Sequence, residues 1–147
     1  MDNLGIRQLC RKCKPIRSVF AGTYPSDAIV PPHKYPAALI VNLDDSQHPG
    51  SHWIVIYCKS PTSAFYFCPL ALYPNKWIEY FLSKFENVRV NICRFQSDKS
   101  TACAHYAIYV CHFMAKGMDF DRLLSRLVRS KNSDKMVRRF VGRLRKS

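Results

Sequence analysis

The sequence predicts an α+β protein, because strand-like and helix-like segments gather in separate zones of its 147 residues. Apolar, β-rich runs fall between residues 37 and 95, and helical patterns dominate residues 100–147. Apolar residues make up 48% of the chain, which is enough for a globular protein with a real core. We expect a single domain over 1–147, with a core over about 18–118 and a basic helical extension over about 119–147.

The first zone, residues 1–36, is expected to hold short elements broken by glycine and proline. The stretch FAGTYPSD (20–27) is typical of a turn-rich loop, and VPPHKYP (30–36) of an extended linker. Cys10 and Cys13 have the spacing of half a zinc site. No second pair with ligand spacing follows in the sequence, so we expect no metal site.

The middle zone predicts four strands and one helix. The strands are AALIVNL (37–43), HWIVIYC (52–58), SAFYFC (63–68) and VRVNICRF (88–95), and DDSQHPGS (44–51) reads as a turn. Val88, Val90 and Ile92 alternate along the fourth strand. Between the last two strands, NKWIEYFLSKF (75–85) predicts an amphipathic helix whose apolar stripe is Trp77, Tyr80, Phe81 and Phe85.

The third zone begins with STACAHYAIYVCHFMAKG (100–117), which is apolar nearly all round. It therefore predicts a central buried helix that ends near Gly117 and is N-capped by Ser100 or Thr101. His105 and His112 on this helix are expected to be core or edge histidines rather than catalysts. The remaining cysteines Cys58, Cys93 and Cys111 are expected to be small core residues.

The C-terminal segment predicts two basic amphipathic helices joined near residues 131–133. Together with a net charge of +13, its composition favours a surface that binds polyanions through phosphate charge, without reading sequence. The residues expected to bind DNA are Arg138, Arg139, Arg143, Arg145 and Lys146, with Arg11 and Lys12 from the N-terminal segment. The alternative is that these charges only solvate the outer faces of docked helices.

Cysteine usage and hydropathy bear on the compartment. Seven cysteines, an odd number, and a polar, basic start without a secretory signal argue against a disulfide framework. We therefore expect a reducing intracellular compartment. No apolar stretch approaches the roughly 20 residues that a membrane span needs, so no membrane partner is expected.

Cys103 is a candidate nucleophile because it falls in the first turn of the predicted helix. Free backbone N–H groups and the helix dipole favour a thiolate there. Gln96, on the segment leading into the helix, is placed to donate to an oxyanion. His52 opens the second predicted strand and is the candidate base, and Trp53 would shield the ion pair from water. Core packing is the competing interpretation of Cys103.

Four motifs in register resemble the adenovirus-type (adenain-like) cysteine proteases, including relatives from virus-like DNA transposons, and more distantly the SUMO-specific proteases. The motifs are FAGTYPSD, AALIVN followed by HPGSHW, FYFCPL, and QSDKSTAC, and the similarity runs from about residue 20 to about 116. The glutamine-to-cysteine spacing of the family is met by Gln96 and Cys103, and Ser100 also matches. The resemblance implies that His52 is the general base, Cys103 the nucleophile and Gln96 the oxyanion donor.

The implied fold is papain-like or adenain-like, a central mixed sheet with the nucleophile on a buried helix. The implied activity is that of a thiol endopeptidase that cleaves viral or transposon capsid or precursor proteins during maturation. No cofactor is required by this chemistry. DNA and a short capsid-derived peptide are expected as activating partners, and the host nucleus or the virion as the location.

Two positions depart from the family pattern. The acid that orients the imidazole is replaced by Cys68, so weakened activity is expected unless Asp44 or Asp45 substitutes. Ala104 stands where the family usually has glycine. Two alternatives therefore remain, a catalytically weakened or inactive homologue that acts as a basic DNA- or capsid-binding module, and a protease of ubiquitin-like modifiers.

Overall fold

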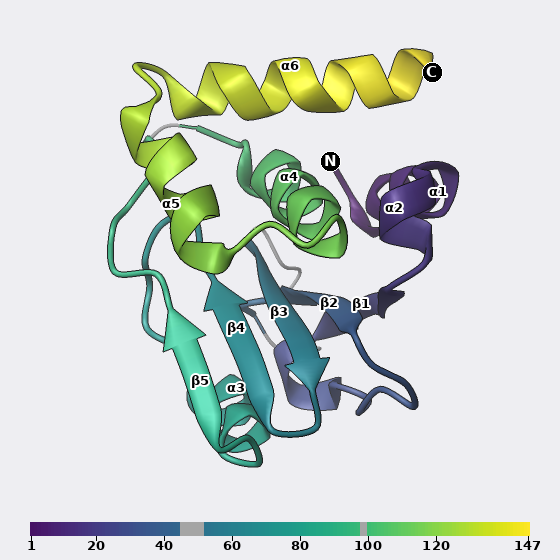
Figure 1. The fold of residues 1–147 in the computed structure, drawn as a ribbon, viewed down its shortest axis with the longest axis vertical. Coiled ribbons are helices and arrows are strands. Elements are labelled where there is room, and N and C mark those ends of the chain that lie inside the picture. Colours follow the sequence, from purple (N-terminus) through teal and green to yellow (C-terminus); the bar gives the residue numbers. More distant parts are fainter. Residues whose placement is uncertain (45–51, 98–99) are drawn as a thin grey trace.

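The computed structural model describes residues 1–44, 52–97 and 100–147, in which five strands form one mixed sheet (Figure 1). The strands, in the order β1-β2-β3-β4-β5, are Phe20–Pro25, Ala37–Asn42, Trp53–Ser60, Ser63–Phe67 and Asn87–Val90. The two outer pairs, β1 with β2 and β4 with β5, are parallel, and the inner pairs are antiparallel. The predicted α+β class with a central mixed sheet is confirmed.

Residues alternate between the two faces of the sheet, as strand geometry requires. On β3, Trp53, Val55 and Tyr57 belong to one buried cluster, whereas Ile54, Ile56 and Cys58 belong to the other. Both faces are covered, which explains why the predicted strands at 37–43, 52–58 and 63–68 read as continuous apolar runs. Their observed bounds agree with the prediction to within two residues.

The two edge strands differ from the prediction. FAGTYPSD is not a loop, because Phe20–Pro25 forms β1 by parallel pairing with β2, followed by a short 3-10 turn at Ser26–Ala28. The register shifts between Phe20 and Gly22, where Gly22 has a φ of 144° that favours glycine. At the other edge β5 ends at Val90, and Val88 and Val90 are exposed where they line an open hollow beside Leu82 and Phe85.

Helices cover both faces of the sheet. Helix α4 (Cys103–Ala115) lies across one face with α1 (Asn3–Lys12) and α2 (Lys14–Arg17), and α3 (Lys76–Leu82) lies on the other (Figure 1). The predicted stripe of α3 is right for Phe81 and wrong for Tyr80, which is 69% exposed. Ile78 and Leu82 are the other buried residues of this helix. Helix α4 ends as predicted, with Gly117 at a φ of 88° just after its C-cap.

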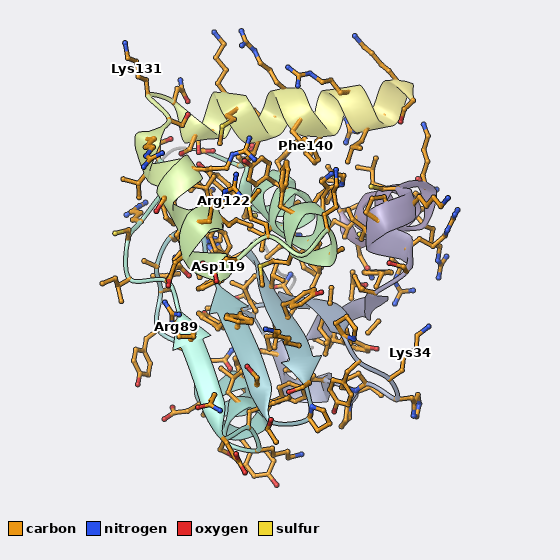
Figure 2. All side chains as sticks on the ribbon, in the orientation of Figure 1. Lys34, Arg89, Asp119, Arg122, Lys131 and Phe140 are labelled. Carbon is orange, nitrogen blue, oxygen red and sulfur yellow. The ribbon has the colours of Figure 1, made fainter. Side chains whose placement is uncertain are left out.

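The two predicted basic helices are α5 (Phe120–Arg129) and α6 (Ser133–Lys146), which meet at a steep angle, with α6 lying over α4. Figure 2 shows nitrogen-tipped side chains projecting from the outer side of α6, and Phe140 pointing toward α4. The Phe140 ring packs against Tyr109 and His112 of α4, at centroid distances of 5.3 and 4.8 Å. The buried cluster under α6 also includes Ile6 and Val141, so it extends beyond residues 18–118.

All seven cysteines lie in the described residues and are thiols. Cys58 and Cys111 are buried core residues as predicted, but Cys93 is exposed because it follows the end of the short edge strand β5. Within the described segments, no cluster of His, Cys, Asp and Glu is arranged to hold a metal ion. No helix in those segments has the length and apolarity needed to cross a bilayer.

Candidate active site

Cys103 is the first residue of α4, a helix that is buried along most of its length. Its N-cap is Ala102 rather than the predicted Ser100 or Thr101, and no side chain caps the helix from that position. The Ser100 hydroxyl instead accepts a hydrogen bond from the backbone N–H of Ala102, at 3.1 Å. Cys103 therefore stands where the free N–H groups of a 13-residue helix gather, and its residue is 6% exposed.

Three segments meet beside the start of α4. In the antiparallel pairing of β3 with β4, Val55 lies opposite Phe67, so the beginning of β3 lies beside the end of β4. The carbonyl of Pro69, just past β4, accepts hydrogen bonds from the N–H groups of Phe95 and Gln96, at 2.8 and 3.0 Å. These contacts bring the segment that carries Gln96 to the end of the sheet where His52 enters β3.

Gln96 is 3% exposed and its side chain is turned toward the start of α4. Its Nε2 donates to the carbonyl of Ser100 at 2.8 Å, three residues before Cys103. Its Oε1 is buried without a hydrogen-bond partner in the described part of the protein. One N–H of the Gln96 amide is therefore used in the hydrogen bond to Ser100, and the second N–H of Nε2 is available to another acceptor.

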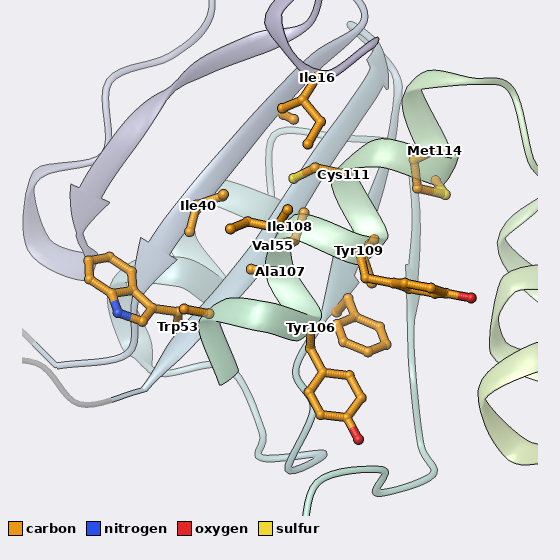
Figure 3. Close-up of a cluster of buried hydrophobic side chains, with 14 of the residues drawn as sticks. Ile16, Ile40, Trp53, Val55, Tyr106, Ala107, Ile108, Tyr109, Cys111 and Met114 are labelled. Atoms are coloured by element: carbon orange, nitrogen blue, oxygen red, sulfur yellow. The ribbon is translucent and has the colours of Figure 1, made fainter. Parts of the chain in front are cut away.

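His52 is the residue immediately before β3, and its carbonyl accepts the N–H of Leu43 at 2.8 Å. The ring atom Nδ1 is buried, and no group among the described residues lies within hydrogen-bond distance of it. Trp53 is 8% exposed and belongs to the same buried cluster as Cys103. Figure 3 shows the Trp53 ring at the same end of α4 as Ala107 and Tyr106, so the start of β3 packs against the first turns of α4.

Cys68 lies at the end of β4, but it belongs to the buried cluster on the α3 face, not to the cluster that contains Cys103. Its backbone N–H and carbonyl are both bound by the side chain of Asn91, at 2.8 and 2.7 Å. Burial raises the pKa of the Cys68 thiol, and hydrogen bonds from backbone N–H groups such as that of Leu72 offset part of this effect. The thiol makes no hydrogen bond to His52 Nδ1.

Of the two proposed substitute acids, Asp44 and Asp45, only Asp44 lies in the described residues. Asp44 is described: its carbonyl accepts hydrogen bonds from the N–H and the hydroxyl of Ser26, and its N–H donates to the side chain of Asn42. No hydrogen bond joins Asp44 to His52 Nδ1. Asp45 and the rest of the predicted turn at 45–51 lie outside the described residues.

The two histidines of α4 have other environments. Burial, together with the positive charges of Arg138, the N-terminus and Arg145, lowers the pKa of His105 to about 4, so its imidazole is neutral near pH 7. Burial also lowers the pKa of His112, whose Nδ1 lies 3.4 Å from the Sγ of Cys13. His105 and His112 are thus neutral side chains of the core and its edge.

Sequence inspection missed a polar network that joins α6 to the site. The Asp134 carboxylate accepts hydrogen bonds from the backbone and side chain of Ser97 and from the Tyr106 hydroxyl. The Ser133 hydroxyl donates to the carbonyl of Phe95 at 3.1 Å. An acid in the first turn of a basic helix was the only sequence signal of this network.

The predicted DNA-binding residues are exposed, and the structure brings their two groups together. Lys12, at the end of α1, donates through Nζ to the carbonyl of Arg145 near the end of α6, at 2.8 Å. A groove of about 1060 Å³ lies between the corner where α5 meets α6 and the segment before α4. Its basic lining residues are Arg94, Lys131, Lys135, Arg138 and Arg139.

A comparison with solved structures shows that the mixed sheet with its covering helices has the fold of a viral cysteine protease. A crystal structure of the ASFV pS273R protease superposes on 95% of this chain with a TM-score of 0.61 and 14% sequence identity. A selenomethionine form of the same protease aligns with 71% of this chain, at a TM-score of 0.49 and 16% identity. The chain covers 65% of the length of that protease in the first alignment. No protein-family model matches the sequence, and no curated protein matches it.

Proposed function

We propose that this chain is a cysteine endopeptidase of the adenain type, with Cys103 as nucleophile, His52 as general base and acid, and Gln96 as oxyanion donor. The proposal depends on the convergence of the start of β3, the end of β4 and the segment before α4, fixed by the hydrogen bonds to the Pro69 carbonyl. His52 Nδ1 and Gln96 Oε1, two of the buried polar atoms that have no hydrogen-bond partner within the described residues, fall in this small region. Such atoms are rare in folded proteins and gather where function requires them.

In the proposed reaction the Cys103 thiolate attacks the carbonyl carbon of a peptide bond and forms a C–S bond. The carbonyl π electrons move onto oxygen, where the second N–H of Gln96 Nε2 and the backbone N–H of Cys103 donate to the oxyanion. The tetrahedral intermediate collapses, the C–N bond breaks, and His52 gives its proton to the leaving amine. Water, deprotonated by His52, then hydrolyses the thioester and restores the thiol.

Thiol labelling tests this proposal without knowledge of the substrate. Cys93 is exposed and is a reference for an unactivated thiol, whereas Cys103 is 6% exposed. We expect iodoacetamide to alkylate Cys103 faster than Cys93, as measured by peptide mass spectrometry over time. His52→Ala is expected to slow the labelling of Cys103 and to leave Cys93 unchanged. Labelling of Cys103 that is no faster than that of Cys93 would rule out an activated nucleophile.

The substrates we propose are capsid or precursor proteins, with maturation in the host nucleus or the virion, as the resemblance to adenain-like proteases implies. A fluorogenic peptide library that includes Gly-Gly reporters separates this activity from cleavage of ubiquitin-like modifiers. We expect Cys103-dependent hydrolysis of peptides outside the Gly-Gly group. Hydrolysis confined to Gly-Gly reporters would assign the second activity instead.

Binding of nucleic acid is a second candidate function, favoured by the basic groove beside α6 and by the net charge of +13. We expect the affinity for duplex DNA to fall as salt rises, with a slope of roughly −0.9 per phosphate neutralised. Replacing Arg139 and Arg143 by alanine should reduce that slope, whereas replacing Lys34 and Lys84, which lie away from α6, should not. Fluorescence anisotropy over a salt series measures both, and binding without salt dependence would contradict the electrostatic interface.

A further inference from the structure

The first turn of α6 contacts the chain on both sides of Gln96. Before it, the carbonyl of Phe95 accepts a hydrogen bond from the Ser133 hydroxyl at 3.1 Å. After it, Ser97 donates to Asp134 Oδ2 through its backbone N–H at 3.3 Å and through its hydroxyl at 2.9 Å. Residues 95 and 97 are therefore both hydrogen-bonded to the first turn of α6, and Gln96 lies between these two fixed positions.

The same carboxylate reaches the nucleophile's helix. The Tyr106 hydroxyl, one turn after Cys103, donates to Asp134 Oδ1 at 2.7 Å and lies 2.6 Å from the Ser133 hydroxyl. Arg138, one turn further along α6, donates to the Thr101 hydroxyl at 3.1 Å. One turn of α6 thus holds the segment before Gln96, the segment after it and the beginning of α4.

Asp134 is suited to this task because it remains ionised. Its burial would raise the pKa of the carboxyl, but hydrogen bonds from Tyr106 and Ser97 outweigh that effect and lower the pKa below its usual value. An ionised carboxylate accepts all of its hydrogen bonds at once, and charge-assisted hydrogen bonds hold their geometry better than neutral ones. The position in the first turn of α6 adds the favourable field of the helix N-terminus.

We propose that Asp134 is a positioning residue for the oxyanion donor: by fixing Ser97 and Tyr106 together, it sets the place of Gln96 relative to Cys103. This inference rests on the proposed function of Cys103 and Gln96. It makes α6 a part of the catalytic apparatus as well as a basic surface. Asp134 makes no contact with the reacting atoms in this scheme, and it acts through the segment that carries Gln96.

Two reactions of Cys103 separate this role from a general structural one. In acylation by p-nitrophenyl acetate, the thiolate attacks the acetyl carbon, an oxyanion forms, and the C–O bond breaks with release of p-nitrophenolate. In alkylation by iodoacetamide, the thiolate displaces iodide from carbon and no oxyanion forms. Loss of the oxyanion donor therefore slows acylation and leaves alkylation unchanged.

The variants are Asp134→Asn and Tyr106→Phe, with Asp121→Asn as the matched control. Asp121 is also in the first turn of a C-terminal helix, α5, but its partner is Arg89 on the surface. Rates of Cys103 acylation are taken after subtraction of the Cys103→Ala background, and thermal melting reports the fold. We expect Asp134→Asn to slow acylation about tenfold, less than the roughly 10²–10³-fold loss of a removed donor, with alkylation unchanged within about twofold. Tyr106→Phe should give a smaller loss in the same direction.

The outcomes are distinguishable. Acylation that is unchanged in both variants overturns the role of Asp134 while leaving the nucleophile in place. Acylation and alkylation that fall in parallel also overturn it, because the defect would then lie in the thiol or in the fold. A wild-type Cys103 that is not acylated above the Cys103→Ala background contradicts the proposed function itself.

Discussion

Two sets of buried polar groups lie at the same end of the sheet, and they differ in how their hydrogen bonds are used. On the α3 side, Asn91 is 6% exposed and its amide makes hydrogen bonds of 2.8, 2.7 and 3.1 Å to the backbone of Cys68 and Cys93. On the α4 side, His52 Nδ1 and Gln96 Oε1 are buried without partners in the described residues. We expect the saturated group to serve stability, and we propose that His52 and Gln96 serve chemistry.

The largest effect is expected from the unsaturated side. Cys103→Ala should abolish peptidase activity, and His52→Ala should lower it by a factor on the order of 10³ or more, because the two act as a unit. Cys103→Ala removes a single sulfur atom, and the Nδ1 atom of His52 has no hydrogen bond to lose within the described residues, so the free energy of unfolding should change little. Peptide hydrolysis and urea unfolding, measured on the same samples, check both halves. A large loss of stability in His52→Ala would contradict the distinction between polar groups that serve stability on the α3 side and polar groups that serve catalysis on the α4 side.

Asn91→Ala should show the opposite pattern. Its loss leaves the backbone N–H and carbonyl of Cys68 buried without partners, which should cost about 2 kcal/mol of unfolding free energy. Asn87→Ala, on the exposed strand β5, is the matched control and should stay within roughly 0.5 kcal/mol. Urea titration measures both. Equal stability of the two variants would mean that the Asn91 hydrogen bonds contribute nothing net.

Local patterns in the sequence predicted part of the fold and of the candidate site. Apolar runs predicted β2, β3 and β4, and the spacing from Gln96 to Cys103 identified the segment that the structure brings to the start of α4. These are local signals, set by periodicity and short spacing. The strand β1 was missed because its glycine and proline are typical of loops, and only parallel pairing with β2 makes it a strand.

Asp134 was missed for a similar reason. Its partners Ser97 and Tyr106 lie 37 and 28 residues away in the sequence, and only the packing of α6 over α4 brings them together. The sequence pattern predicts that a strand ends at Cys68, but it does not determine which face of the sheet the Cys68 side chain takes. The burial of Cys68 on the α3 face could therefore not be predicted. Tertiary contacts of this kind leave no periodic trace in the sequence.

His105 provides a test of whether an unpartnered atom always signals function. Its Nδ1 is buried without a partner in the described residues, yet its pKa is lowered to about 4 by burial and by nearby positive charges. The unfolded chain binds a proton near pH 6.5 and the folded chain does not, so stability falls as the pH drops from about 6.5 to about 4. After allowance for solvent screening, we expect His105→Asn to remove roughly 1 kcal/mol of this pH dependence. Urea unfolding at pH 7 and pH 4.5 measures it, and identical pH profiles for the variant and the wild type would contradict the shift.

Cys68→Ala should have the smallest effect on activity, although Cys68 stands where an orienting acid was expected. Its thiol faces the α3 cluster and makes no hydrogen bond to His52 Nδ1, so acylation of Cys103 should stay within about twofold of wild type. The variant should lose about 1 kcal/mol of stability, as should the control Cys58→Ala on the same face, because each leaves a small cavity in one buried cluster. p-Nitrophenyl acetate kinetics and urea unfolding decide the matter together. A tenfold loss of acylation in Cys68→Ala, without the same loss in Cys58→Ala, would show that the thiol orients the imidazole after all, and that both sides of the sheet contribute to catalysis.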